Sequence, residues 1–186
     1  MRILVFILIL SASLQGCFPV IAAGAGAGAL MVNDRRTSGA YVEDQAIETK
    51  AFDRVGKQFK SEVHVNVTSF NRTILISGEV PDPAAKTQVE RIVANIQNTG
   101  KIYNELAVAP LASLSSRSND TLITSNVKMR FMGNKNFSAT SIKVVTENSV
   151  VYLMGIVTHA EATAATEVAS GSRGATRIVP LFEFVE

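Results

Sequence analysis

The residue of this sequence best placed to do chemistry is Cys17, which is its only cysteine. A lone cysteine has no disulfide partner within the chain, so its thiol is either a small apolar group in a core or the site of a modification. The residues before it favour modification. Arg2 supplies a positive charge, and Ile3 to Leu10 form an apolar run of signal-peptide length that is too short to cross a bilayer. We therefore expect residues 1–16 to be a secretion signal.

The stretch Leu14-Gln15-Gly16-Cys17 resembles the lipobox of bacterial lipoproteins, although Gln15 stands where a small residue is usual. The resemblance implies that the signal is cut before Cys17 and that the sulfur receives a diacylglycerol. Phe18 follows where an aspartate would, by resemblance to enterobacterial lipoproteins, favour retention in the inner membrane. This implies a lipid anchor in the outer membrane, on its periplasmic face. Two alternatives remain open: ordinary cleavage within Ala22 to Ala29, and an uncleaved anchor.

The other residue types that could do chemistry are scattered. His64 falls on the polar positions of an expected strand and His159 at the start of an expected helix, so we interpret both as exposed side chains. Nucleophilic catalysis needs a nucleophile beside a base, and a metal site needs several convergent ligands. The sequence pattern predicts neither arrangement. We expect no enzyme activity, no catalytic residue, no metal and no cofactor.

Composition narrows the class of partner. The chain has 18 Lys and Arg against 16 Asp and Glu, so its overall charge gives no reason to expect a nucleic acid partner.

Two segments that are rich in small residues and poor in periodicity divide the chain. We interpret residues 17–42 as the lipidated cysteine with a flexible tether and residues 110–118 as an interdomain linker. The domains are then expected at residues 43–109 and 119–186.

An internal repeat supports this division. The stretch "HVNVTSFNRTILISGEV" aligns with the later stretch "SIKVVTENSVVYLMGIV" without a gap, so that Gly78 falls on Gly155 and Val80 on Val157. Each copy begins with helical periodicity, changes to the alternation typical of strands, and returns to helical periodicity before a last strand. Two copies of one αββαβ fold are therefore predicted.

The periodicity also places individual residues. In the first copy, Phe52, Val55 and Phe59 share a helical face that we expect to be buried. We expect a turn at Asn71-Arg72 and a last strand over residues 101–108. Caps are expected where Asp82 precedes Pro83 and where Thr158 and Glu161 have capping-box spacing.

These residues resemble the BON domain of bacterial envelope proteins. Its marks are this element order, a glycine ending the second strand, and a last strand reading roughly Val-x-Asn-x-Leu. Gly78 with Val80 and the stretch Ile102-Tyr103-Asn104-Glu105-Leu106 match these marks, and the second copy keeps Gly155 but lacks the asparagine. The resemblance implies an α+β fold of two tandem BON domains, each with two helices packed on a three-stranded mixed sheet.

A lipobox followed by two BON domains resembles a class of outer-membrane lipoproteins. That resemblance implies a non-enzymatic protein that supports envelope integrity, gathers at division sites and binds anionic phospholipid through its second BON domain. It also implies proximity to the outer-membrane protein assembly machinery. A periplasmic adaptor that acts on this machinery is the alternative.

The first helix of the second copy has two apolar sides. Ile123, Val127 and Phe131 form its expected core face, while Leu122, Met129 and Met132 cluster on the opposite face. In the first copy the opposite face of the equivalent helix carries charges, so we expect it to have only one apolar side. In the lipoproteins that the chain resembles, the lipid-contacting surface includes this helix and carries a tryptophan where this chain has Leu122.

The charge around this second apolar side has one sign. Lys128, Arg130, Lys135 and Lys143 occur between Thr121 and Thr146 without an Asp or Glu. Apolar side chains ringed by cations suit an anionic membrane interface. The expected phospholipid-binding residues are Leu122, Ser125, Lys128, Met129, Met132 and Lys135. The alternative is that this surface packs on the first domain or on another protein.

Overall fold

The computed structural model of the protein describes residues 34–185. The expected signal of residues 1–16, Cys17 and the tether up to residue 33 lie outside the described residues. Among residues 34–185 no helix combines the length and the apolar character that crossing a membrane requires.

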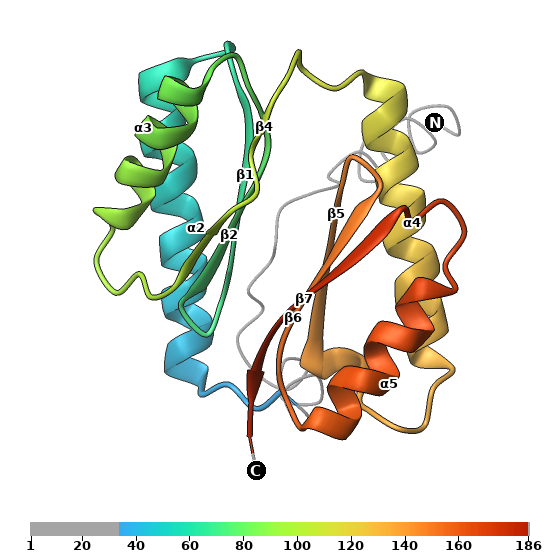
Figure 1. The fold of residues 1–186 in the computed structure, drawn as a ribbon. Coiled ribbons are helices and arrows are strands. Elements are labelled where there is room, and N and C mark those ends of the chain that lie inside the picture. The colour runs from blue at the N-terminus through green and yellow to red at the C-terminus, as the bar shows by residue number, and fades with distance from the viewer. Residues whose placement is uncertain (1–33, 186) are drawn as a thin grey trace, which may run out of the picture. The chain divides into compact units, whose positions relative to one another are not determined.

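Two α-β-β-α-β units follow one another along the chain (Figure 1). The first contains α2 (Ser38–Phe59), β1 (His64–Phe70), β2 (Thr73–Val80), α3 (Pro83–Ala94), β3 (Ile102–Asn104) and β4 (Ala107–Val108). The second contains α4 (Leu114–Met132), the short 3-10 helix η1 (Ala139–Ser141), β5 (Ile142–Glu147), β6 (Val150–Val157), α5 (His159–Ser170) and β7 (Arg177–Phe184).

Each unit has a mixed sheet with the hairpin's second strand in the middle. β2 pairs antiparallel with β1 and parallel with β3 and β4, and β6 pairs antiparallel with β5 and parallel with β7. The two helices of each unit pack on one face of its sheet (Figure 1). This confirms the predicted α+β fold of two repeated units, each with two helices packed on a mixed sheet.

The last strand of the first unit is interrupted, although it was expected to be continuous. The break falls at Glu105 and Leu106, and the Leu106 side chain is buried in the core. In the register of the parallel strands, Leu106 lies opposite Gly78. The backbone φ of Gly78 is +116°. A Cβ on Gly78 would lie 2.0 Å from the carbonyl oxygen of His64, so this position requires glycine, as the sequence pattern indicated.

The first helix of each unit begins within a segment that was expected to be a tether or a linker. Thr37 accepts a hydrogen bond from the Ala40 backbone N–H and caps α2, so residues 38–42 are helical and do not belong to a tether. Ser113 accepts one from the Ser116 N–H and caps α4, so residues 114–118 are helical and do not belong to a linker. Ser and Thr favour both loops and N-caps, which is why these segments read as linkers. The predicted caps at Asp82 and Thr158 are confirmed.

The buried face of α2 differs from the expected one. Val55 and Phe59 are in the core as predicted, but Phe52 is 76% exposed. The buried residues recur every four positions from Ile47 to Phe59, and Phe52 points about 100° around the helix from Ala51, which is in this run. The small side chain of Ala51 occupies the place that the sequence pattern assigned to Phe52.

A buried aspartate in the first helix of each unit holds the hairpin turn. The carboxylate of Asp44 accepts the backbone N–H groups of Asn71 and Arg72, both at 2.8 Å. Asp120 accepts those of Asn148 and Ser149 at 3.0 and 2.8 Å. These four turn residues have φ between 50° and 66°, which is typical of a two-residue hairpin turn, and the predicted turn at Asn71-Arg72 is confirmed. The two aspartates were not anticipated from the sequence.

The sheet faces that are not covered by helices contact each other. Phe70 and Leu75 of the first unit form one apolar cluster with Tyr152, Met154 and Leu181 of the second. Polar side chains also join the two units, and one such contact is the ion pair between Lys143 and Glu48 at 2.7 Å. β2 and β6, the middle strands of the two sheets, are therefore buried on both faces.

Candidate functional site

The sequence-predicted core face of α4 is confirmed. Ile123, Val127 and Phe131 are almost fully buried and pack on the second sheet and α5. Together with Asp120 they fix the rotation of the helix about its axis. The side chains on the opposite side of α4 must then face away from the sheet.

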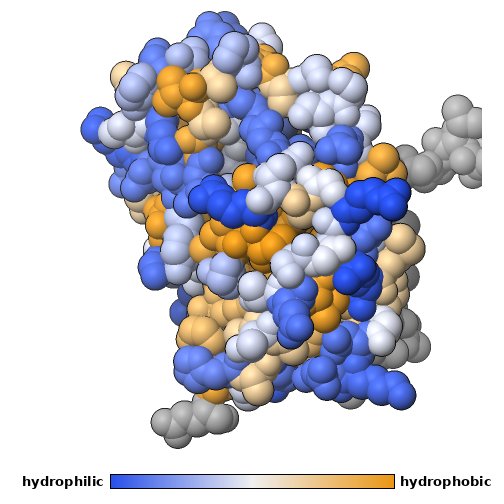
Figure 2. All heavy atoms as spheres, turned by 45° about the vertical axis from the view of Figure 1, so that its right-hand side comes forward, coloured by the Kyte–Doolittle hydropathy of each residue, from blue (hydrophilic) through white to orange (hydrophobic). Residues whose placement is uncertain are grey.

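Three large apolar side chains lie on this outer side. Leu122, Met129 and Met132 are 69%, 61% and 71% exposed. With Ser125 they occupy an arc of about 80° around the helix, and we call these four residues the α4 stripe. Figure 2 shows the side of the molecule that carries α4, with hydrophobic patches interrupted by hydrophilic groups. The exposed Leu114, in the first turn of α4, was missed because its segment read as a linker.

The other repeat shows that the fold does not require this apolar bulk. The buried residues of α2 and α4 coincide when Ile47 is placed on Ile123 and Val55 on Phe131. The same register places Ala46, Asp53 and Gly56 at the positions of Leu122, Met129 and Met132. An equivalent helix thus packs on an equivalent sheet with small or acidic residues at these positions. The α4 stripe is therefore a property of the second unit alone.

The exposed sides of α2 and α4 differ less in apolar character than expected. Because Phe52 is exposed, α2 also presents an apolar side chain outside the core, and it was expected to have only one apolar side. Its surroundings differ, however. Lys50, Asp53 and Arg54 give the exposed side of α2 charges of both signs.

The cations around the α4 stripe are fewer than the sequence indicated. Lys128 and Lys135 are exposed and have no ion-pair partner among residues 34–185. Arg130 donates from Nε to the Val168 carbonyl oxygen of α5 at 3.0 Å. Lys143 is engaged by Glu48 of the first unit and is not available to a ligand. The positive charge beside the stripe therefore comes chiefly from Lys128 and Lys135.

A cavity of about 380 Å³ lies beside the polar edge of the α4 stripe. Ser125 and Lys128 line it from α4, and Thr146 and Glu147 line it from β5. The hydroxyl of Ser125 donates to the Thr121 carbonyl oxygen at 2.9 Å. The structure thus brings the predicted Ser125 and Lys128 together on one rim.

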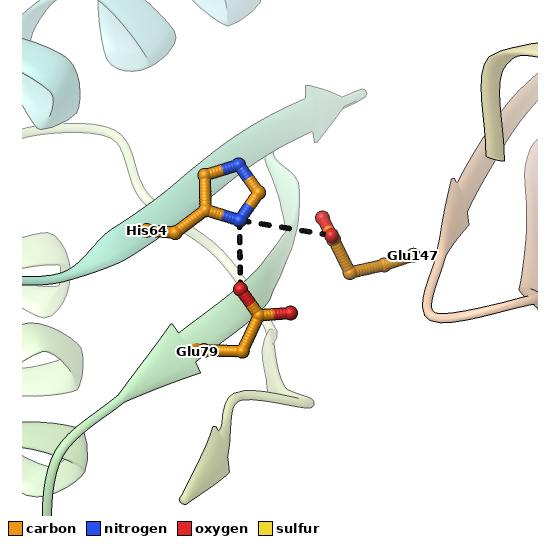
Figure 3. A group of neighbouring side chains, drawn as sticks. All are labelled: His64, Glu79 and Glu147. Atoms are coloured by element: carbon orange, nitrogen blue, oxygen red, sulfur yellow. Dashed lines mark hydrogen bonds and ion pairs between the residues drawn. The ribbon is translucent and has the colours of Figure 1, made fainter. Parts of the chain in front are cut away.

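A second group of polar side chains lies where the two units meet (Figure 3). His64 of β1 was interpreted as an exposed side chain, and this was wrong: its ring is half-buried, and Nδ1 lies 3.0 Å from Oε2 of Glu79 and 3.8 Å from Oε1 of Glu147. Sequence reasoning missed the group because Glu147 comes from the other repeat. His159 is exposed, as expected, and its ring stacks on Phe184 with the centroids 4.1 Å apart.

The two carboxylates of this group have different environments. Burial alone would raise the pKa of Glu79, but hydrogen bonds from the Ala112 backbone N–H, Asn148 and His64 lower it below its ordinary value. Burial raises the pKa of Glu147, and the hydrogen bond from Asn66 offsets this only in part. Glu147 is therefore the less well compensated of the two negative charges.

Comparison with known proteins gives a family match for each of the two units. The model of the BON domain matches residues 43–110 and 119–186. The chain is 33% identical over 175 residues to the outer membrane lipoprotein DolP of Haemophilus influenzae, covering 93% of this chain and 91% of that protein. It is 31% identical over 155 residues to a 21 kDa hemolysin of Actinobacillus pleuropneumoniae, covering 82% of this chain and 80% of that protein.

Among solved structures, the chain matches the C-terminal domain of CdsD, the structural protein of the type III secretion system of Chlamydia trachomatis. The match has a TM-score of 0.32 and 9% sequence identity, and it covers 74% of this chain and 96% of that chain.

Proposed function

The chain belongs to the BON-domain family, and on that basis we propose that it is an outer-membrane lipoprotein that binds anionic phospholipid through α4 of its second BON domain. The observation that carries the proposal is the α4 stripe. Its three exposed apolar side chains lie beside cations that have no ion-pair partner in the described part of the chain. Packing of the helix on its sheet does not require apolar side chains at these positions. The lipoprotein DolP, to which most of the chain is similar, supports the cellular location.

The energetics of the stripe fit an interfacial helix. Burying a Leu or Met side chain that is otherwise exposed contributes about 1.5 to 3 kcal/mol. A lysine near an anionic membrane surface adds about 1 kcal/mol. Leu122, Met129 and Met132 with Lys128 and Lys135 thus form a contact that is weak enough to be reversible. Leucine at position 122 lacks the interfacial preference of an indole, so its contribution is apolar burial alone.

The lipid anchor and the stripe reinforce each other. An anchor on Cys17 holds the folded part near one membrane, which raises the local concentration of lipid headgroups at α4. Several acyl chains hold a protein stably where one chain holds it marginally. We propose the periplasmic face of the outer membrane as the location, with envelope integrity at division sites as the process that the protein supports. No catalytic step is part of this proposal.

Vesicle sedimentation of a protein that comprises residues 34–186 tests the lipid surface, and the decisive variants are those of Leu122 and Met132.

A second candidate function is that of an adaptor on the outer-membrane protein assembly machinery. The observation that favours it is the stripe itself, because three exposed apolar side chains also suit a protein partner. Undiminished vesicle binding by a folded variant with glutamates in the stripe would favour the adaptor.

The anchor is tested by replacing Cys17 with alanine. Because its sulfur is the acceptor of the lipid, the Cys17→Ala protein is expected to incorporate no fatty-acid label and to accumulate as the uncleaved precursor. Metabolic labelling with a fatty-acid analogue followed by gel electrophoresis measures both effects. Equal label in the variant and the parent protein would contradict the lipoprotein assignment.

A further inference from the structure

The group formed by His64, Glu79 and Glu147 combines an imidazole with two carboxylates. His64 and Glu79 are paired across β1 and β2 in the first BON domain, and Glu147 ends β5 in the second. One ligand-type atom from each residue lies within 4.8 Å of the others. Figure 3 shows the three side chains pointing toward one another from separate strands. They are brought together only by the contact of the two sheets.

The repeat indicates that the fold does not require acidic residues at these places. The register that aligns Gly78 with Gly155 also places Glu79 on Ile156 and Phe70 on Glu147. Phe70 is buried in the apolar cluster between the sheets, and Ile156 packs against the same cluster. The two glutamates thus occupy positions that the other repeat fills with apolar side chains. Their presence calls for an explanation other than packing.

Ion pairs balance the negative charge of the group only in part. Glu79 and Glu147 are only 1% and 7% exposed, and neither forms an ion pair with a Lys or Arg among residues 34–185. Within this range, one histidine is the only partner that can carry a positive charge for two buried carboxylates. Oε1 of Glu147 accepts no hydrogen bond from the described residues, and it faces His64. A buried carboxylate without an ion pair is unfavourable, and a bound cation relieves this cost, as protonation also does.

We propose that these three residues bind a divalent transition-metal ion of the zinc class, and that the ion joins the two BON domains. Zn²⁺ takes imidazole nitrogen and carboxylate oxygen at about 2.0 to 2.2 Å, so two ligands on a tetrahedral ion lie about 3.4 Å apart. The separations of 3.0 and 3.8 Å from Nδ1 to the carboxylates bracket this value. The bound ion takes Nδ1 of His64, Oε2 of Glu79 and Oε1 of Glu147.

The surroundings suit such an ion. In the bound form Nδ1 gives its lone pair to the ion and the single proton of the neutral ring sits on Nε2, so the Asn66 amide, 3.3 Å from Nε2, gives up that contact and keeps its hydrogen bond to Oε2 of Glu147. Two cavities lined by both His64 and Glu147 give access to solvent, which supplies a water molecule as a fourth ligand. The amide of Asn148 donates to Oε1 of Glu79 at 2.7 Å and orients that carboxylate. The site shares the cavity of about 380 Å³ with Ser125 and Lys128, but none of its three ligands belongs to the α4 stripe.

Calorimetric titration of the full-length protein in detergent with zinc chloride tests the site. We expect one ion per chain, and we expect His64→Ala and Glu147→Gln each to weaken the affinity by more than about tenfold. The chain has one other histidine, so His159→Gln is the matched control and should bind zinc as the parent does. Absence of zinc binding by the parent protein would overturn the proposal. So would binding that both site variants retain.

A second readout guards against variants that fail to fold. Glutamine at position 147 removes a buried negative charge and keeps the shape of the side chain, so Glu147→Gln should fold. Zinc should raise the melting temperature of the parent and of His159→Gln, since an ion that binds only the folded state stabilises it. It should not raise that of Glu147→Gln. An equal rise in all three proteins would contradict the site.

Discussion

Replacing both Leu122 and Met132 by glutamate is expected to weaken binding of the folded part to anionic vesicles by at least about 100-fold. Each change removes about 1.5 to 3 kcal/mol of apolar burial in the interface and adds a negative charge that the lipid headgroups repel. Sedimentation with vesicles rich in an anionic phospholipid measures the loss. Circular dichroism should show a native fold, because both side chains are largely exposed.

The matched control lies on the equivalent helix of the first domain. Phe52 is also an exposed apolar side chain, and it occupies the position of Lys128 when the helices are superposed. Phe52→Glu should leave vesicle binding unchanged. High salt should weaken binding of the parent protein, because screening shortens the reach of Lys128 and Lys135. A double variant that is folded and binds as the parent does would assign the stripe to a protein partner.

Replacing Asp44 by alanine is expected to destabilise the folded part by about 3 to 5 kcal/mol. The carboxylate of Asp44 is fully buried and accepts the backbone N–H groups of the β1-β2 turn and the hydroxyl of Ser69. It also pairs with Arg36 at 2.9 Å, whose side chain is only 8% exposed. The alanine variant leaves the two turn N–H groups and the Ser69 hydroxyl without this acceptor, while Arg36 keeps its pair with Asp34 at 2.7 Å. Urea denaturation followed by circular dichroism gives the change in free energy of unfolding.

The neighbouring Glu43 provides the control for this experiment. Its carboxylate pairs with Arg72 at 2.7 Å, but the pair is exposed to solvent. Glu43→Ala should therefore lower the free energy of unfolding by less than about 1 kcal/mol. If the two variants lost similar amounts of unfolding free energy, burial of Asp44 would not explain its contribution to stability.

The sequence predicted the elements that have a regular apolar period. The repeat identified two copies of one fold, and the helical spacing of Ile123, Val127 and Phe131 correctly placed one face of α4 in the core. That assignment put Leu122, Met129 and Met132 on the outside, where the structure has them. Solvent exposure of these residues follows from local periodicity alone. Whether they contact lipid depends on a partner and stays a prediction.

Features that depend on the contact between the repeats could not be predicted. Alternation in β1 assigned His64 to the polar face, but that face meets β5 of the second unit, so the histidine is half-buried. Phe52 was wrongly assigned to the core because Phe52, Val55 and Phe59 are large and recur at helical spacing, whereas Ala51 is small. One available signal was overlooked. The first helices of the repeats align in a register that differs by a single position from that of the strands, and only the helix register pairs Asp44 with Asp120.

The contact between α4 and lipid is tested most directly by a nuclear magnetic resonance spectrum of residues 34–186 with anionic vesicles that carry nitroxide-labelled lipid. The paramagnetic label broadens the amide signals of residues that approach the membrane. Broadening is expected to be greatest from Leu122 to Lys135 and absent from the exposed side of α2 around Phe52. Broadening centred on α2, or none on α4 while the vesicles bind, would contradict this expectation.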